Sequence, residues 1–220
     1  MKTQTLAAGL VSIAFVGLTL ACERAKEPSA PAASKVNASS AHSRASEREG
    51  DQKFRWDIIS VDFATGTVSA GGVASAKAND GSTITLTGSG TFRPGETDDV
   101  TGGGTWETFN PTATSTGHGT YRVSRLVRFD VAPGTPPLPH DNIGIRATIR
   151  AGLVVLQISY SDGSRGILVV SCDLVGSPNT IFEGVTASKE FTDFWNREAP
   201  PAPPGNANRT VFHLLSEDDD

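Results

Sequence analysis

An arginine in an apolar row is the residue whose type and position most directly suggest chemistry in this chain. From Tyr121 to Val131 the odd positions are apolar except Arg125, so the alternation predicts a strand that buries its odd face. A buried guanidinium needs a carboxylate, a carbonyl or a ligand anion. We therefore weigh an internal partner such as Glu107 or Asp62, or a rim position in solvent, against an anionic or carbonyl-bearing ligand inside the fold.

Three further residues fit a pocket around this arginine. Gln157 interrupts another apolar strand and offers a second polar contact, while Trp106 and Tyr121 are aromatic residues suited to a pocket wall. We predict Arg125, Gln157, Trp106 and Tyr121 as ligand contacts. The proline-rich stretch 132–142 is long for a hairpin connection and predicts a fixed rim beside such a site.

Metal chemistry has weak support in the sequence. His118, His140 and His213 lack the short spacings of a zinc site, although His118 and His140 with Asp141 form one conceivable set. An acidic loop suggests calcium but lacks the alternating ligands of a dedicated site; it contains Glu96, Asp98 and Asp99. We predict no metal and no cofactor.

Nucleophilic catalysis has no recognisable motif. The chain contains neither Gly-x-Ser-x-Gly nor Ser-x-x-Lys, and the glycine-rich segments open no helix, so no phosphate-binding loop is expected. Cys172 ends an apolar run and reads as a buried thiol. The catalytic residues of any enzyme are therefore unknown, and the sequence leans against an enzyme.

The elements that must position these residues are strands. From Phe54 to about residue 174, β-formers and recurrent turn residues predict β-structure throughout, with hairpin turns at 79–82 and 161–164. We predict an all-β fold, an antiparallel barrel of eight to ten strands, with a β-sandwich as the alternative. A Phe and Trp stripe predicts one short helix at about 188–196, packed outside the barrel.

A repeat marks three of these strands. Gly-x-Gly-Thr-aromatic occurs at 88–92, 102–106 and 117–121, a period that fits one strand plus one turn of a meander. We expect the glycines to serve packing, with a glycine-lined ligand wall as the alternative. With the hairpin at 160–166, the repeat resembles uncharacterised exported bacterial β-proteins over about residues 54–215. The strand count also resembles lipocalin-type and allene-oxide-cyclase-type barrels, which implies a fold and no activity.

The chain begins like a secretory signal. A basic start and an apolar run over 6–20 precede Ala21 and Cys22, an order that resembles bacterial lipoproteins cleaved before a lipid-carrying cysteine. We predict a signal peptide over 1–21 and a lipid on Cys22. Simple secretion is the alternative, because Thr19 stands where Leu is usual. Glu23, in place of Asp, favours the outer membrane in bacteria with two membranes.

The rest of the chain divides by composition. Residues 22–52 hold almost no large apolar side chains and predict a disordered tether, 53–215 the β-domain and 216–220 an acidic tail. Without Lys2 the mature chain has 18 basic and 24 acidic residues, a balance of −6, which argues against a nucleic-acid partner.

These observations predict a lipid-anchored envelope protein that binds a small, partly apolar ligand in a barrel. Two alternatives stay open: a structural or protein-interaction module of the envelope, whose partner is unknown, and a cyclase- or isomerase-type enzyme.

Overall fold

A computed structural model describes residues 52–216 of the chain. The predicted signal peptide, the lipidation site Cys22, the tether except for its last residue, and the acidic tail after Ser216 lie outside the described residues.

Within residues 52–216 the chain forms fourteen strands of one sheet and a single 3₁₀ turn, η1 (Arg146–Thr148). The strands are β1 (Phe54–Asp62), β2 (Thr67–Ala70), β3 (Ala74–Lys77), β4 (Thr83–Leu86), β5 (Ser89–Phe92), β6 (Gly103–Phe109), β7 (Ser115–Ala132), β8 (His140–Asp141), β9 (Ile149–Tyr160), β10 (Arg165–Cys172), β11 (Gly184–Lys189), β12 (Thr192–Phe194), β13 (Asn196–Arg197) and β14 (Arg209–Leu214). No helix in this part of the chain is long and apolar enough to cross a membrane.

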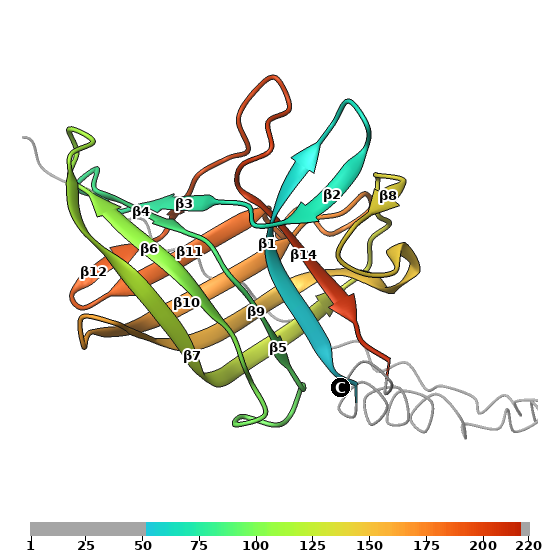
Figure 1. Cartoon of the computed structure of the whole chain (residues 1–220), viewed down its shortest axis with the longest axis horizontal. Coiled ribbons are helices and arrows are strands. Elements are labelled where there is room, and N and C mark those ends of the chain that lie inside the picture. The colour runs from blue at the N-terminus through green and yellow to red at the C-terminus, as the bar shows by residue number, and fades with distance from the viewer. Residues whose placement is uncertain (1–51, 217–220) are drawn as a thin grey trace, which may run out of the picture. The chain divides into compact units, whose positions relative to one another are not determined.

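Six antiparallel strands close a barrel (Figure 1). Hydrogen-bonded pairs run β9–β14–β1–β5–β6–β7 and return from β7 to β9. The other strands extend this ring: β10, β11 and β12 continue from β9, β4, β3 and β13 continue from β6, and β2 and β8 continue from β1. The predicted all-β antiparallel barrel is confirmed, and closure excludes the sandwich. The ring itself has six strands instead of the expected eight to ten, because the remaining strands extend the sheet outside the ring.

Aromatic and aliphatic side chains fill the barrel. Phe54, Phe92, Phe129 and Phe212 form a cluster of mutually stacked and edge-on rings with centroids 4.8 to 6.3 Å apart. Around them β9 and β10 contribute the inward residues of their alternating pattern, all of them buried. Burial of this apolar surface is the main driving force for closing the ring.

The glycine repeat serves this packing, as expected. Its aromatic residues, Phe92, Trp106 and Tyr121, are buried on the neighbouring strands β5, β6 and β7. A Cβ on Gly88 would lie 2.2 Å from the hydroxyl oxygen of Tyr121, closer than real Cβ atoms approach, and one on Gly119 would lie 3.0 Å from Nε1 of Trp106. The glycines therefore make room for large rings on adjacent strands.

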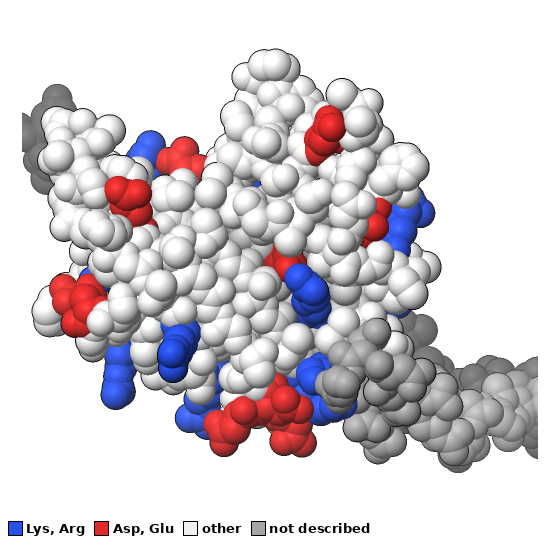
Figure 2. All heavy atoms as spheres, viewed as in Figure 1, with Lys and Arg blue, Asp and Glu red and all other residues white. Residues whose placement is uncertain are grey.

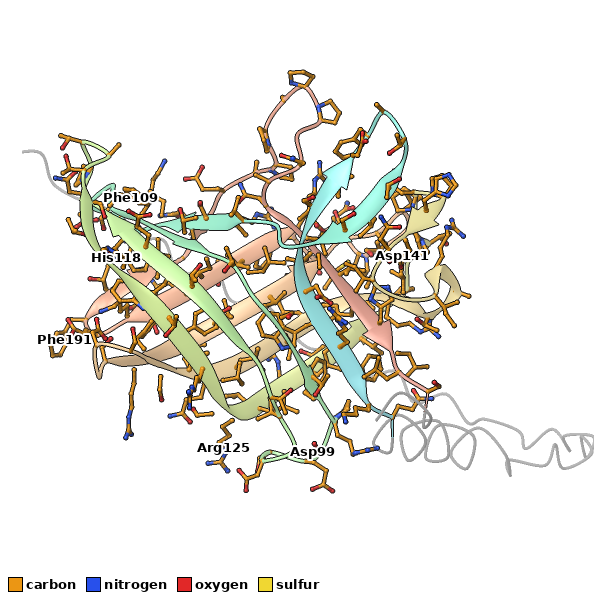
Figure 3. The ribbon with its side chains drawn as sticks, in the orientation of Figure 1. Asp99, Phe109, His118, Arg125, Asp141 and Phe191 are labelled. Atoms are coloured by element: carbon orange, nitrogen blue, oxygen red, sulfur yellow. The ribbon has the colours of Figure 1, made fainter. Side chains whose placement is uncertain are left out.

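The predicted helix at 188–196 is wrong. The segment is a hairpin of β11 and β12 followed by β13, and its turn is formed by Glu190 and Phe191, with Glu190 at a φ of 54°. Strand alternation buries Phe194 but leaves Phe191 and Trp195 exposed. The three aromatic residues that suggested one helical stripe therefore lie on different sides of the chain, and Phe191 points away from the barrel at the hairpin tip (Figure 3).

A second apolar cluster lies outside the ring. It contains Ile59 and Val61 of β1, Val68 of β2, Ile149 of β9 and Val211 of β14. The covering segment, defined as residues 133–148 and including β8 and η1, packs Leu138 and Ile143 against these side chains.

Candidate functional site

A groove runs along the outer face of β1 and β14, beneath the covering segment. Its apolar walls are Ile59, Val61, Phe63, Pro136, Pro137, Leu138, Ile149, Leu174 and Val211, and its polar residues are Asp173, Glu183, Arg209 and Thr210. We call this the Glu183 groove. An apolar concavity with a few convergent polar groups is the usual form of a small-molecule site.

Glu183 immediately precedes β11, where its side chain joins two strand ends. Its Oε1 accepts a hydrogen bond from the backbone N–H of Thr210 at 2.7 Å, and its Oε2 accepts one from that of Asp173 at 2.8 Å. Burial raises the pKa of Glu183 to about 8, and the two N–H donors and Arg209 oppose this shift. A neutral carboxylic acid can donate a hydrogen bond to an oxygen in the groove.

Arg209 supplies the positive charge of the groove. Its guanidinium lies 5.3 Å from the centre of the Phe63 ring, and its Nε donates a hydrogen bond to the carbonyl of Gly205 at 3.5 Å. The aromatic contact holds the group in a partly buried position at the wall. Arg209 and Glu183 can therefore both offer N–H or O–H donors to an oxygen of a ligand.

A more polar hollow of about 500 Å³ lies on the other side of Glu183. It shares Asp173, Leu174 and Glu183 with the groove, and its further lining includes Ser177, Asn179, Phe182 and Arg197. The guanidinium of Arg197 lies 5.1 Å from the centre of the Phe182 ring. We call this the Arg197 hollow.

Polar contacts hold the covering segment over the groove. Oδ2 of Asp141 lies 2.7 Å from Nε2 of His213, and both side chains are buried. Oδ1 of the same carboxylate accepts backbone hydrogen bonds from Ile143 and Gly144 at 2.8 and 3.2 Å. Arg146 adds bonds to the carbonyls of Leu138 and of Pro136 within the segment.

An ion pair lies on the same outer face of the sheet. Arg55, opposite His213 in the β1–β14 register, donates from Nε and Nη2 to the buried carboxylate of Asp57 at 2.7 and 2.8 Å. This bond and the nearby carboxylate of Asp141 raise the pKa of Arg55, although desolvation opposes them. Arg55 and His213 also line a hollow of about 360 Å³ beneath the covering segment.

Arg125 does not point into the barrel. Register shifts occur between Val123 and Arg125 and between Leu126 and Arg128, so the strict alternation along β7 is broken. Leu126 is buried in place of its odd-numbered neighbours, and Arg125 is exposed. Its side chain points away from the barrel at the lower edge in Figure 3. The predicted internal partner and the predicted interior ligand contact are both wrong for this residue, and its exposure agrees with the alternative of a position in solvent.

The structure does not bring the other predicted ligand contacts together around a cavity. Gln157 alternates with the buried residues of β9 and lies on its outer side. Trp106 and Tyr121 are inside, but they pack against Tyr160, and their polar atoms donate to backbone carbonyls of Thr120 and Thr87. These rings are part of the solid core.

The structure does not bring together the set considered for a metal, which was His118, His140 and Asp141. Asp141 is hydrogen-bonded to His213, while His118 of β7 lies opposite Glu107 of β6. Within residues 52–216 no three His, Cys, Asp or Glu side chains are arranged to hold a metal ion. Cys172 is buried, and burial raises its pKa well above the ordinary value.

In the acidic loop, Asp99 pairs with Nε of Arg93 at 3.0 Å. Figure 2 shows acidic and basic atoms side by side at that edge, with a largely uncharged surface above them.

The sequence missed Glu183 and Arg209. Neither lies in a motif, and each is placed by a partner distant in sequence: the backbone N–H of Thr210 for Glu183 and the ring of Phe63 for Arg209. The proline-rich stretch was a usable signal, because Pro136 and Pro137 form part of the groove wall. No protein-family model matches this chain, and no curated protein or solved structure matches it either.

Proposed function

We propose that this protein binds a small, partly apolar ligand that carries a carbonyl or carboxylate oxygen, and that it does so in the Glu183 groove. The observation that supports this most is the combination of apolar walls with Glu183 and Arg209 as convergent polar groups. The sequence led us to expect the ligand inside the barrel. The packed aromatic interior leads us to place it outside.

The groove suits such a ligand on energetic grounds. The groove is small, about 80 Å³, so it takes one apolar group of a ligand, and burying that group gains about 25 cal/mol for each Å² removed from water. The covering segment is already fixed by the buried Asp141–His213 contact and by the bond of Arg146 to Leu138, so little conformational entropy is lost when a ligand enters. Arg209 and protonated Glu183 would orient the oxygen.

Native mass spectrometry tests this proposal. The mature chain with Cys22→Ser, purified from its own host, should carry extra mass that disappears on denaturation. Leu138→Arg, which places a long cation in the groove from the partly exposed covering segment, should lose that mass. Val131→Arg, at an exposed site outside the groove, should keep it. Equal occupancy in both variants would contradict the proposal.

We further propose that the protein is anchored by lipid at Cys22 in the bacterial envelope, on the periplasmic face of the outer membrane where the host has two membranes. The supporting observation is the order of basic start, apolar run, Ala21 and Cys22.

A protein-interaction role is the second candidate. It is favoured by Phe191, fully exposed at the tip of the β11–β12 hairpin, and by Trp195, which is 65% exposed. Large aromatic residues are enriched at protein interfaces. Replacing both by Ser should abolish co-purification of a specific envelope partner while leaving the ligand mass unchanged.

A further inference from the structure

Three polar side chains form one row across β5, β1 and β14. Arg55 of β1 lies opposite Thr91 of β5 on one side and opposite His213 of β14 on the other. Side chains that lie opposite one another in antiparallel strands project from the same face, with Cβ atoms about 5 Å apart. The row therefore presents a hydroxyl, a guanidinium and an imidazole side by side on the outer face of the barrel.

This row forms one side of the hollow of about 360 Å³ beneath the covering segment, which we call the His213 hollow. Its other lining residues come from the covering segment, from β14 and from the residues after it: Ile143, Gly144, Ile145, Thr148, Leu214, Leu215 and Ser216. None of the residues that line the His213 hollow lines the Glu183 groove. A site here is therefore separate from the groove, and its volume is within the range of small-molecule pockets.

The contacts of Asp141 decide which nitrogen of His213 carries the proton. Oδ1 of Asp141, the residue labelled in Figure 3, accepts backbone hydrogen bonds from Ile143 and Gly144, and Oδ2 lies 2.7 Å from Nε2 of His213. Such backbone donors stabilise an ionised carboxylate, which can only accept hydrogen bonds. We therefore assign the proton to Nε2, so that Nδ1 of the neutral imidazole holds a lone pair.

Nδ1 of His213 is a buried acceptor without a donor. His213 is 1% exposed, and none of the described residues donates a hydrogen bond to this nitrogen. A Cβ on Gly144 would lie 2.9 Å from Cδ2 and 3.2 Å from Nε2, so Gly144 faces the edge of the ring opposite Nδ1. Because a buried acceptor left unpaired is costly, Nδ1 points to a ligand that supplies the donor.

Arg55 supplies a donor in the same row. Its Nε and Nη2 donate to the buried carboxylate of Asp57, which fixes the plane of the guanidinium, while Nη1 donates no hydrogen bond to the described residues. One hydroxyl oxygen can satisfy both side chains, because it accepts an N–H from Arg55 and donates its own proton to Nδ1 of His213. A carboxylate or ether oxygen has no proton to donate.

The charges around the row also favour a neutral group. Among the residues of the row and their direct partners, Arg55 carries one positive charge, and the buried carboxylates of Asp57 and Asp141 carry one negative charge each. With a neutral His213 the balance is negative by one charge. An anion is therefore disfavoured, whereas a neutral hydroxyl is not.

We propose that the His213 hollow binds the hydroxyl group of a small, neutral, partly apolar alcohol. Arg55 donates to the hydroxyl oxygen, the hydroxyl donates to Nδ1 of His213, and Asp141 holds the imidazole in the required tautomer. The carbon skeleton packs against Ile143 and Leu215. This site goes beyond the proposed function and does not depend on occupancy of the Glu183 groove.

Three probes that share a six-membered carbon ring test the need for a hydroxyl proton: cyclohexanol, its methyl ether methoxycyclohexane, and cyclohexanecarboxylate. Each is titrated into the mature Cys22→Ser chain and followed by amide NMR. Cyclohexanol should shift the amides of Ile145 and Leu215 and bind about tenfold more tightly than the ether, which leaves Nδ1 unpaired. The carboxylate should bind no better than the ether. The ¹⁵N resonance of His213 Nδ1 should be that of an unprotonated nitrogen and should move with cyclohexanol alone.

His213→Gln removes the acceptor and keeps the contact with Asp141. A glutamine amide can donate to Asp141 from the position of Nε2, but it places no acceptor at the position of Nδ1. This variant should bind cyclohexanol and its ether equally, whereas His118→Gln, at an exposed histidine of β7, should keep the tenfold difference. Arg55→Lys keeps the charge beside Asp57 but loses the guanidinium fork, so it should weaken both probes in parallel.

The outcomes distinguish this site from the Glu183 groove. Equal affinities of the wild type for cyclohexanol and its ether would overturn the inference, because the hollow would then hold only the carbon ring. Cyclohexanol shifts confined to groove residues such as Asp173 and Leu174 would also overturn it and would leave the proposed function standing. A hydroxyl-dependent shift at Ile145 in a protein whose groove carries no ligand would support the inference and contradict the proposed function.

Discussion

Glu183 illustrates how one side chain can be held by opposing effects. Two backbone N–H groups bond to its oxygens and favour the carboxylate, while burial against apolar walls favours the neutral acid. Because burial has the larger effect, the folded protein keeps a proton that the unfolded chain releases near pH 4.5. The stability of the fold is therefore linked to this proton.

The sign of the linkage gives the first prediction. Between the ordinary pKa of 4.5 and the folded value of about 8, the folded state holds one more proton, so stability falls as pH rises and levels off above about pH 8. Relative to Glu183→Gln, the wild type should lose roughly 2 kcal/mol between pH 6 and pH 8. Urea unfolding at both pH values measures this, and the variant subtracts the contribution of the histidines. Parallel pH profiles of the two proteins would contradict it.

For Arg125 we predict almost no effect on stability or on ligand binding. The side chain of Arg125 is exposed on β7, and the next residue, Leu126, is the one that is buried. Arg125→Ala should therefore change the free energy of unfolding by no more than about 0.5 kcal/mol. Its ligand occupancy in native mass spectra should equal that of the wild type. If Arg125→Ala lost the ligand, Arg125 would have to be part of the binding site, and this prediction would be wrong.

At the scale of elements, the covering segment owes its position to a few polar bonds made by the buried side chain of Asp141. Asp141 alone connects the imidazole of His213 to the backbone of Ile143 and Gly144. These bonds tie an irregular stretch to β14, the strand that also supplies Arg209 and Val211 to the groove. Fixing this segment therefore also fixes one wall of the candidate site.

Removing Asp141 should show its contribution. Asp141→Ala should cost about 3 kcal/mol of unfolding free energy. His213 loses its buried polar partner, and the backbone N–H groups of Ile143 and Gly144 lose the carboxylate that accepts their hydrogen bonds. Amide exchange at Asn142, which bonds to Val68 of β2, should accelerate. Asp130→Ala is the matched control, because its ion pair with Arg128 is more than half exposed and should contribute less than about 1 kcal/mol.

The glycine repeat gives a prediction about strand contact. A Cβ at Gly90 would lie 2.2 Å from the carbonyl oxygen of Thr101 and 2.8 Å from Nε1 of Trp56. Gly90→Ala should therefore destabilise the barrel by about 3 kcal/mol, because β1 and the start of β6 must move apart. Gly163→Ala meets no atom within 4 Å and should cost only the strain of its positive φ, about 1 kcal/mol. Thermal unfolding of the two variants compares these effects.

At the scale of the whole molecule, the sequence predicts which segments form strands, but it does not predict which side chains meet across neighbouring strands. Alternation, turn residues and the glycine repeat each report on neighbours within about fifteen residues, and they predicted the barrel and its meander from β5 to β7. Two bulges in β7 were invisible to alternation, so Arg125 was placed on the wrong face. Glu183 depends on backbone donors at Asp173 and Thr210, and no local pattern reports such contacts.

The anchoring prediction also belongs at this scale. Cys22→Ser should move the protein from the detergent phase to the aqueous phase in a detergent-partition assay, because the acyl chains supply the membrane affinity. Cys172→Ser, at the buried thiol, is the control and should leave partitioning unchanged provided that it folds. Wild type found in the aqueous phase would favour simple secretion.

Ring closure has a consequence for the order of events in biogenesis. β14 joins β1 to β9, although about 150 residues separate β1 from β14 along the chain. A polypeptide emerging from its N-terminus exposes the pairing edge of β1 until β14, the last strand of the described residues, has appeared. Such an open edge invites pairing with other chains. The partly emerged chain is thus the form most in need of a chaperone, and a variant that lacks only β14 should aggregate more than the full chain.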